Sequence, residues 1–256
     1  MLWPDVDLHV VSGKGGTGKT TLAAAMALAL AHDGRRTLLM EVEGRQGIAQ
    51  LFDTAPLPYE ERRVAVAPGG HGEVWALAVD PEEALLDYLA IYYNLRSAGS
   101  ALRRIGAIDF ATTIAPGLRD VLLTGKACEV VRRKDKAGAN AYDAIVLDAP
   151  PTGRIAKFLN VTAEVSGLAR TGPIRKHADL VMGVIGSPRT AVHLVTVLEE
   201  MPVQETIDAV DELREHRLPV GGVLVNMVRQ QVLTPDELTS IETGAIDPVE
   251  LAFALR

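Results

Sequence analysis

Hydrophobic and polar positions divide the chain into two kinds of segment. Short apolar runs rich in β-branched residues predict strands at 7–12, 36–42, 74–79, 142–147, 190–198 and 220–225. Longer stretches with helix-forming residues or helical spacing predict helices at 21–31, 154–168 and 203–215. Strands that alternate with helices indicate an α/β fold with a mostly parallel β-sheet flanked by helices. Ligand loops in such folds lie at the carboxyl ends of the strands.

A longer helical stretch interrupts this alternation at about 81–133. Apolar residues there fall on one face, and Gly106 and Pro116 break the stretch into pieces. Before it, the glycines and proline of 60–72 predict a surface loop or a hairpin. The chain has no internal repeat, so we expect one domain over 1–256 with a helical insert. The apolar stripe of the insert either packs into the core or forms a groove for a client protein.

Composition narrows the class of protein. Of 256 residues, 48% are hydrophobic and 23% are charged, as in ordinary folded domains. A net charge of -7 argues against general binding to nucleic acid or to anionic membranes. Cys128 is the only cysteine, which excludes an internal disulfide and fits a reducing compartment. Neither a membrane-spanning run nor a secretory signal is visible, so we expect a cytoplasmic protein.

The segment SGKGGTGKTT at 12–21 carries the most specific chemistry. It contains the pattern G-x-x-x-x-G-K-[ST] between a predicted strand and a predicted helix. Glycines permit positive φ angles, so successive backbone N–H groups can surround phosphate oxygens. Lys19 is expected on the β- and γ-phosphates and the Thr20 hydroxyl on Mg²⁺. The expected nucleotide contacts are Gly13, Lys14, Gly15, Gly16, Thr17, Gly18, Lys19, Thr20 and Thr21.

A second candidate is the strand AIVL, which ends at Asp148 and is followed by Ala-Pro-Pro-Thr-Gly. Aspartates often begin turns, so this residue alone indicates little. Together with the glycine loop it predicts a carboxylate that holds the Mg²⁺ hydration shell. The turn would place Pro151 and Gly153 near a γ-phosphate as a switch loop.

GKGGTGKTT, AIVLDAPPTG and VLVN resemble the deviant P-loop ATPases that dimerise around nucleotide. Within that class the chain is most similar to arsenite-pump and tail-anchored-protein-targeting ATPases. EVEGRQGIAQLF, FATTIAPGLRDVLLTGK and DAPPTGRIAKFL resemble their actinobacterial branch, described as anion-transporting ATPases. The resemblance implies ATP or ADP with Mg²⁺, Lys14 contacting phosphates across a dimer interface, and Asn226 reading the adenine edge. The alternative for Lys14 is a solvated cation of the loop with no role at the nucleotide.

The chain departs from the family after the second predicted strand. Counting back from Phe52 places Glu43 where the family has its water-orienting aspartate. A carboxylate one methylene longer can still orient water, but positioning carries most of the catalysis, so we expect slow hydrolysis. Glu43 alternatively is an exposed acid that begins a loop. Glu41 competes for the role, because strand alternation points Glu41 and Glu43 the same way.

Two further departures concern metals and length. The arsenite pump's three thiolates and the targeting ATPases' zinc cysteines are missing, since Cys128 stands alone. Anion transport is therefore a family description that these residues do not support chemically. The chain ends at Arg256, short of the usual family length, so we expect the segment that completes the adenine pocket to be reduced.

Two functions of different classes follow. The first is a Mg²⁺-dependent ATPase whose nucleotide state opens and closes a homodimer, or a heterodimer with a paralogous subunit, that acts on a protein client. The second is a nucleotide-dependent scaffold subunit with slow or no hydrolysis. A partitioning ATPase that works on DNA or membrane ranks below both, because the C-terminal IDPVELAFALR has no cationic face.

Overall fold

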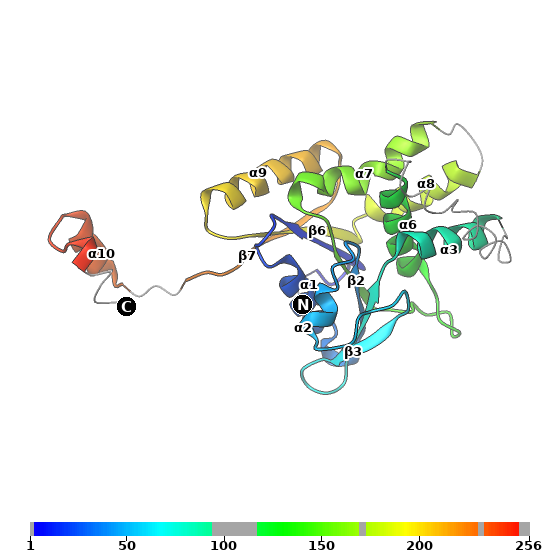
Figure 1. Cartoon of the computed structure of the whole chain (residues 1–256), viewed down its shortest axis with the longest axis horizontal. Helices are drawn as coiled ribbons and strands as arrows, with labels where there is room; N and C mark the ends of the chain where they lie inside the picture. The colour runs from blue at the N-terminus through cyan, green and yellow to red at the C-terminus, as the bar shows by residue number, and fades with distance from the viewer. Residues whose placement is uncertain (1–2, 94–116, 169–172, 230–232, 251–256) are drawn as a thin grey trace. The chain divides into compact units, whose positions relative to one another are not determined.

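The computed structural model describes residues 3–93, 117–168, 173–229 and 233–250 (Figure 1). Contacts divide the chain into two units, Met1–Asn226 and Met227–Arg256. A single ATPase domain over 1–256 remains a prediction, and residues 94–116 of the expected insert lie outside the described residues.

The second unit contains one described helix, α10 (Pro235–Glu242). Thr234 caps it, because the Thr234 hydroxyl accepts from Glu237 N at 3.4 Å while the Glu237 carboxylate accepts from Thr234 N at 2.7 Å. This reciprocal capping box pairs two backbone N–H groups that the helix itself leaves free.

The first unit is built on a seven-stranded sheet in the order β3-β4-β2-β5-β1-β6-β7. β3 pairs antiparallel with β4, and the other neighbours pair in parallel. This arrangement confirms the predicted α/β fold, and the β3–β4 pair confirms the hairpin. The strands are β1 Leu8–Gly13, β2 Arg36–Glu41, β3 Arg62–Val66, β4 Glu73–Ala78, β5 Ala144–Asp148, β6 Thr190–Thr196 and β7 Val220–Val225.

Helices cover both faces of this sheet (Figure 1). The predictions at 21–31, 154–168 and 203–215 are confirmed to within a few residues, whereas α2, α8 and α10 were not predicted. None of the described helices is long and apolar enough to cross a membrane. The helices of this unit are α1 Lys19–Leu30, the 3-10 turn His32–Gly34, α2 Gly47–Leu51, α3 Pro81–Tyr93, α6 Leu118–Arg132, α7 Thr152–Leu168, α8 Pro173–Ile185 and α9 Glu200–Glu215.

Alternation along the strands builds two separate cores. In β1, Leu8 and Val10 belong to the core packed by α3, α6, α7, α8 and α9, whereas Val11 belongs to the core packed by α1 and α2. Leu38 and Leu39 of β2 divide in the same way. Because both faces are covered, every residue of β1, β5 and β6 is buried.

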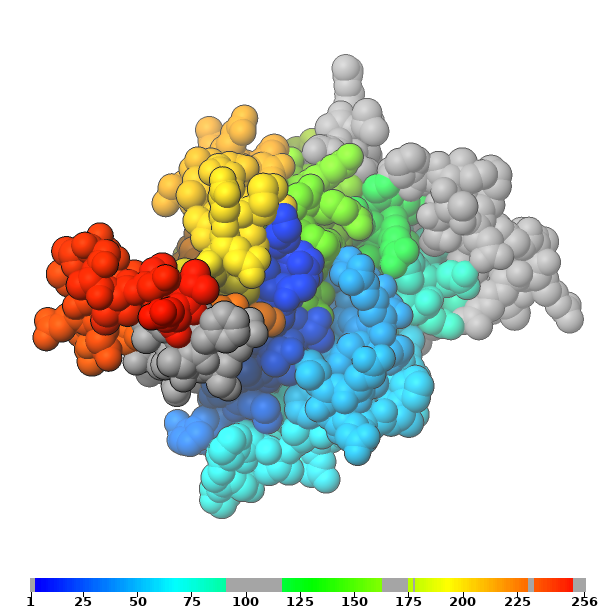
Figure 2. All heavy atoms as spheres, turned by 60° about the vertical axis from the view of Figure 1, so that its left-hand side comes forward, coloured from blue at the N-terminus to red at the C-terminus, as the bar shows by residue number. Residues whose placement is uncertain are grey.

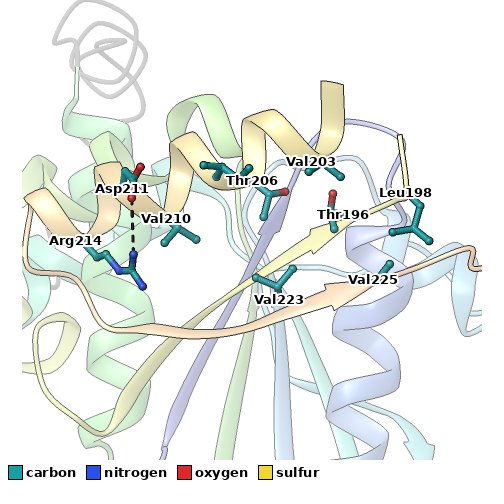
Figure 3. Close-up of a pocket in the computed structure, with 10 residues that line it drawn as sticks. Thr196, Leu198, Val203, Thr206, Val210, Asp211, Arg214, Val223 and Val225 are labelled. Carbon is teal, nitrogen blue, oxygen red and sulfur yellow. Dashed lines mark ion pairs between the residues drawn. The ribbon is translucent and has the colours of Figure 1, made fainter. Parts of the chain in front are cut away.

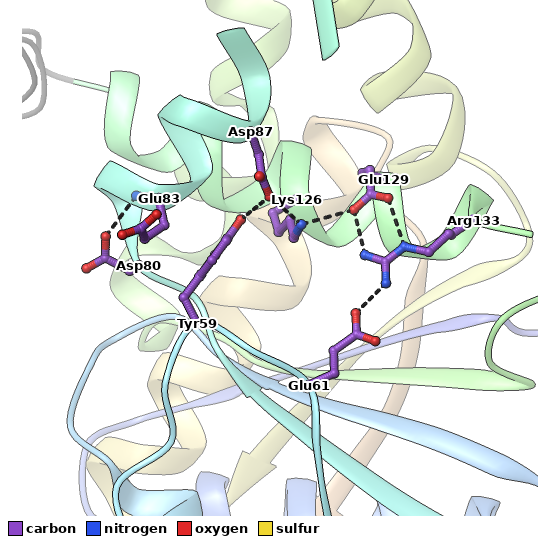
Figure 4. Close-up of polar contacts among 8 residues, drawn as sticks. All are labelled: Tyr59, Glu61, Asp80, Glu83, Asp87, Lys126, Glu129 and Arg133. Atoms are coloured by element: carbon purple, nitrogen blue, oxygen red, sulfur yellow. Dashed lines mark hydrogen bonds and ion pairs between the residues drawn. The ribbon is translucent and has the colours of Figure 1, made fainter. Parts of the chain in front are cut away.

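A chain of ion pairs fastens α3 and α6 to the segment before β3 (Figure 4). Lys126 of α6 is only 13% exposed and lies 2.7 Å from Asp87 of α3 and 3.3 Å from Glu129. Arg133 pairs with Glu129 at 2.8 Å and also with Glu61. The described parts of the helical insert are therefore held to the segment before β3 by polar contacts, in addition to the packing of α3 and α6 in the core.

Candidate functional site

The carboxyl ends of β1, β2 and β5 meet at one edge of the sheet. In the strand register, Asp148 of β5 lies opposite Val11 of β1 and opposite Glu41 of β2. The glycine loop after β1, the acidic loop after β2 and the turn after Asp148 are therefore neighbours. The sequence predicted ligand loops at the carboxyl ends of parallel strands, and the structure adds which strands are neighbours.

Glycine is required at several positions of the loop at 13–18. Gly16 and Gly18 have φ angles of 90° and 87°, in the left-handed region that other residues enter only with strain. At Gly13, an added Cβ would lie 2.3 Å from the carbonyl oxygen of Val195 in β6. The backbone thus approaches β6 more closely than any side chain would allow.

Hydrogen bonds from neighbouring segments fix this loop. The Asn226 side chain at the end of β7 donates to the carbonyl of Thr17 at 2.9 Å, and the Thr17 hydroxyl donates to the carbonyl of Lys14 at 2.8 Å. At the loop's entrance, Ser12 Oγ donates to the carbonyl of Pro150 at 2.6 Å. Asn226, which the resemblance assigns to adenine, therefore reaches the loop itself in this structure.

Helix α1 begins directly at Lys19, after Gly18. No side chain caps it and no acidic residue lies in its first turn, so its first N–H groups face the loop. Among the described residues, no acceptor lies within hydrogen-bonding distance of Lys19 Nζ. A helix N-terminus with a lysine at its first residue offers backbone N–H groups and positive charge to an anion.

Thr20 and Asp148 form the candidate metal site. Thr20 Oγ1 donates to Asp148 Oδ2 at 2.7 Å, and Asp148 Oδ1 is buried without a partner among the described residues. Burial raises the pKa of Asp148 to about 6, while Thr20 and Lys19 act in the opposite direction. Hydroxyl and carboxylate oxygens are ligands that Mg²⁺ prefers, and it completes its shell with phosphate and water. The residues present therefore fit this ion.

The described residues contain no group of three or more His, Cys, Asp or Glu side chains that could hold a metal ion. A magnesium site of the kind above needs no such cluster, because one or two protein ligands suffice when phosphate is bound.

The structure separates the two acids that strand alternation could not distinguish. Glu41 is buried and accepts from the backbone N–H groups of Gln46 at 2.5 Å and Ile48 at 3.2 Å, at the start of α2. Glu43 is 21% exposed, and its paired cation is Arg45 at 3.8 Å. Glu41 therefore accepts hydrogen bonds from the backbone, whereas the only ion pair of Glu43 among the described residues is the 3.8 Å pair with Arg45.

Helix α2 brings this acidic loop close to the metal site. An added Cβ at Gly47 would lie 3.2 Å from Thr20 Cγ2, so the start of α2 packs on the first turn of α1. Thr21, also in that turn, is exposed. After Asp148, Pro151 is half-buried and Gly153 is exposed at the start of α7.

Lys14 has a partner that the sequence did not predict. Its ammonium forms an ion pair with Glu205 of α9, and Glu205 also accepts from the Thr152 hydroxyl at 3.1 Å. Figure 2 shows the blue N-terminal part of the chain between the yellow segment that includes α9 and the lighter blue segment after β2. No local pattern marked Glu205, since 191 positions separate it from Lys14.

A separate apolar groove of about 440 Å³ lies between α9 and the end of the sheet formed by β6 and β7 (Figure 3). Val223 and Val225 of β7 are 48% and 45% exposed there. Asp211 and Arg214, which pair at 3.8 Å, supply its charges. The remaining lining residues are Thr196, Leu198, Val203, Thr206, Ile207 and Val210.

A strand, a glycine loop with left-handed residues, a helix that begins at a lysine, and a threonine bonded to an aspartate together define a P-loop nucleoside triphosphatase. Sequence comparison gives the particular family. The profile of the anion-transporting ATPases matches residues 7–185, and the chain belongs to that family.

Individual relatives agree with this assignment. The chain is 57% identical to ATPase BagA of Mycobacterium tuberculosis over 249 residues, which cover 96% of this chain and 73% of the relative. It is 26% identical to ATPase GET3 of Kluyveromyces lactis, with 85% and 71% covered, and 26% identical to the arsenical pump-driving ATPase of Acidiphilium multivorum, with 85% and 38% covered. The chain is accordingly a nucleotide-binding ATPase.

Proposed function

We propose that this chain hydrolyses ATP with Mg²⁺ and that its nucleotide state opens and closes a dimer that acts on a protein partner. The observation that carries the proposal is the Thr20–Asp148 hydrogen bond of 2.7 Å beside the glycine loop. A hydroxyl and a carboxylate held at this distance can enter the shell of one cation without a large rearrangement.

Each residue has a defined task in this proposal. The loop N–H groups and Lys19 hold the phosphates, and Thr20 and Asp148 hold the metal. Bound Mg²⁺ would supply positive charge to the phosphate oxygens. Glu43 orients the attacking water, because it is the acid of this loop that makes no backbone hydrogen bond in the described structure.

The proposal of a dimer is based on Lys14. A second lysine inside the loop is not needed to cradle phosphate within one protomer, so it is available for a nucleotide in the other protomer. We propose either a homodimer or a heterodimer with a paralogous subunit. The helical insert, in which Lys126 joins α3 to α6 and Arg133 pairs with Glu61 before β3, is the proposed client-handling region.

Two measurements on the purified chain test this function: single-turnover hydrolysis of ATP, and the affinity for Mg·ATP measured by calorimetry. Lys19→Ala is expected to weaken Mg·ATP binding by about a hundredfold or more, because it removes a charge-assisted phosphate contact. Lys157→Ala, an exposed lysine of α7, is the matched control and is expected to change nothing. Equal binding by wild type and Lys19→Ala would refute the proposal.

One observation favours a scaffold role as the second function. Glu43 is one methylene longer than aspartate, and its ion pair with Arg45 is 3.8 Å long, so it would hold an attacking water molecule less precisely than an aspartate would. If Glu43→Ala hydrolyses ATP as slowly as the wild type while nucleotide still drives dimer formation in sedimentation velocity, the scaffold function replaces the catalytic one.

A further inference from the structure

One carboxylate joins three segments around the phosphate loop. Glu205 of α9 accepts from Lys14 Nζ at Oε1 and from Thr152 Oγ1 at Oε2. Lys14 belongs to the loop after β1, and Thr152 begins α7 immediately after the turn from Asp148. Both oxygens of Glu205 are therefore in use, and each contacts an element of the nucleotide site.

The two lysines of the phosphate loop differ in their hydrogen-bond partners. Lys14 is held by Glu205, whereas Lys19 has no hydrogen-bond acceptor among the described residues. The hydrogen bond from Lys14 holds the pKa of Glu205 below its ordinary value, so the carboxylate stays charged at neutral pH. The side chains of Lys14 and Glu205 are 31% and 35% exposed, so water reaches the pair and its net stabilisation is small.

A weak, solvent-accessible ion pair can exchange partners readily. A nucleotide phosphate is an anion that would attract the same ammonium. Whatever free energy Lys14 gains from phosphate is then reduced by what it loses on leaving Glu205. The Glu205 carboxylate and a nucleotide phosphate would therefore compete for the Lys14 ammonium.

We propose that Glu205 is a positioning residue that holds Lys14 back and competes with the nucleotide phosphate for its ammonium. This inference rests on the proposed function, in which Lys14 contacts a phosphate. When Lys14 leaves, the Thr152 hydroxyl is the remaining hydrogen-bond partner of Glu205 among the described residues. A shift of Glu205 is therefore transmitted through Thr152 to the turn after Asp148. Glu205 thereby sets how strongly nucleotide must bind before Lys14 takes up its place on the phosphate.

The test is a double-mutant cycle on the full chain. Glu205→Gln keeps the size and a hydrogen bond to Thr152 but removes the charge. The Kd for a non-hydrolysable ATP analogue with Mg²⁺, measured by calorimetry, is expected to fall about two- to fivefold, the range of a partly exposed ion pair. In a Lys14→Met background the same substitution is expected to leave the Kd unchanged, because the competing ammonium is gone.

Glu200→Gln removes the same charge from the same helix without touching Lys14, and it is expected to leave the Kd unchanged. Glu205→Ala is a second variant with the same expected direction, and thermal melts verify that all variants fold. An unchanged or higher Kd in Glu205→Gln overturns the inference, as does an equal shift in the Lys14→Met background. If the wild type hydrolyses ATP and only the shift is missing, the proposed function stands; if the wild type binds no nucleotide, both fall.

Discussion

The buried histidine pair beneath the phosphate loop predicts a specific loss of stability in acid. His9 of β1 and His193 of β6 are fully buried, with His9 Nδ1 and His193 Nε2 3.1 Å apart. Gly222 N donates to His193 Nδ1 at 3.2 Å, so neutral His193 carries its proton on Nε2 and donates it to His9. Trp3 packs edge-on against His193 at 4.5 Å between ring centroids.

Burial lowers the pKa of His9 and of His193 from 6.5 to about 4. Both histidines therefore stay neutral in the folded protein at a pH where the unfolded chain is already protonated. The contribution of the two histidines to the free energy of unfolding is fully present above pH 6.5. It is lost as the pH falls from 6.5 toward 4. From about pH 8 to about pH 5, each histidine is expected to remove about 2 kcal/mol from the free energy of unfolding.

Urea unfolding across this pH range, compared between wild type and His9→Leu/His193→Leu, measures the loss. Asp148 acts with the opposite sign, because its raised pKa makes the folded state bind a proton more readily. That contribution is common to both proteins and cancels in the difference. A second measurement follows the imidazole NMR resonances, which are not expected to titrate above about pH 5. The reasoning is refuted if both proteins lose equal stability, or if either ring titrates near pH 6.5.

Three other substitutions test the remaining parts of the structure. Gly13→Ala is expected to abolish nucleotide binding in calorimetry, because its Cβ would lie 2.3 Å from Val195 O, whereas Gly183→Ala in α8, with nothing within 4 Å, serves as control. Glu43→Ala is expected to lower kcat about tenfold or more with little change in KM, and an unchanged kcat would exclude it from catalysis. Lys126→Met is expected to cost about 1–2 kcal/mol in urea unfolding, since carboxylates of α3 and α6 lose their shared cation.

The glycine loop and the start of the helix after it were predictable, because one contiguous segment carries their pattern. The loop at 13–18, Lys19 and Thr20 needed only a pattern of residue types, and Asp148 stood out as an acid that ends an apolar strand in a chain with this loop. The short helix α2 was missed because five residues show no periodicity. α8 was missed although Ala178, Val181 and Ile185, all buried, repeat at helical spacing.

Contacts between distant segments were not predictable in the same way. Glu41 and Glu43 share a strand direction, and only the turn at Gln46, with a φ angle of 57°, brings backbone N–H groups onto Glu41. Glu205 is one of several acids on α9, and nothing in its local sequence distinguishes it. Choosing among chemically equal carboxylates requires the path of the backbone, which depends on packing far from the residue concerned.

Some contacts of the phosphate loop are fixed in the free protein, whereas the Lys14–Glu205 ion pair can exchange partners when nucleotide binds. This difference indicates which contacts can change the conformation. Gly16 and Gly18 already have left-handed backbones, and Asn226 and Ser12 tether the loop, so binding pays little to order it. A ligand shifts a conformational equilibrium only through contacts that differ between the two states. Contacts that stay the same in the free and the nucleotide-bound protein therefore cannot drive the switch that we propose. The partly exposed Lys14–Glu205 pair can, because phosphate offers Lys14 a second partner and its loss is felt at Thr152.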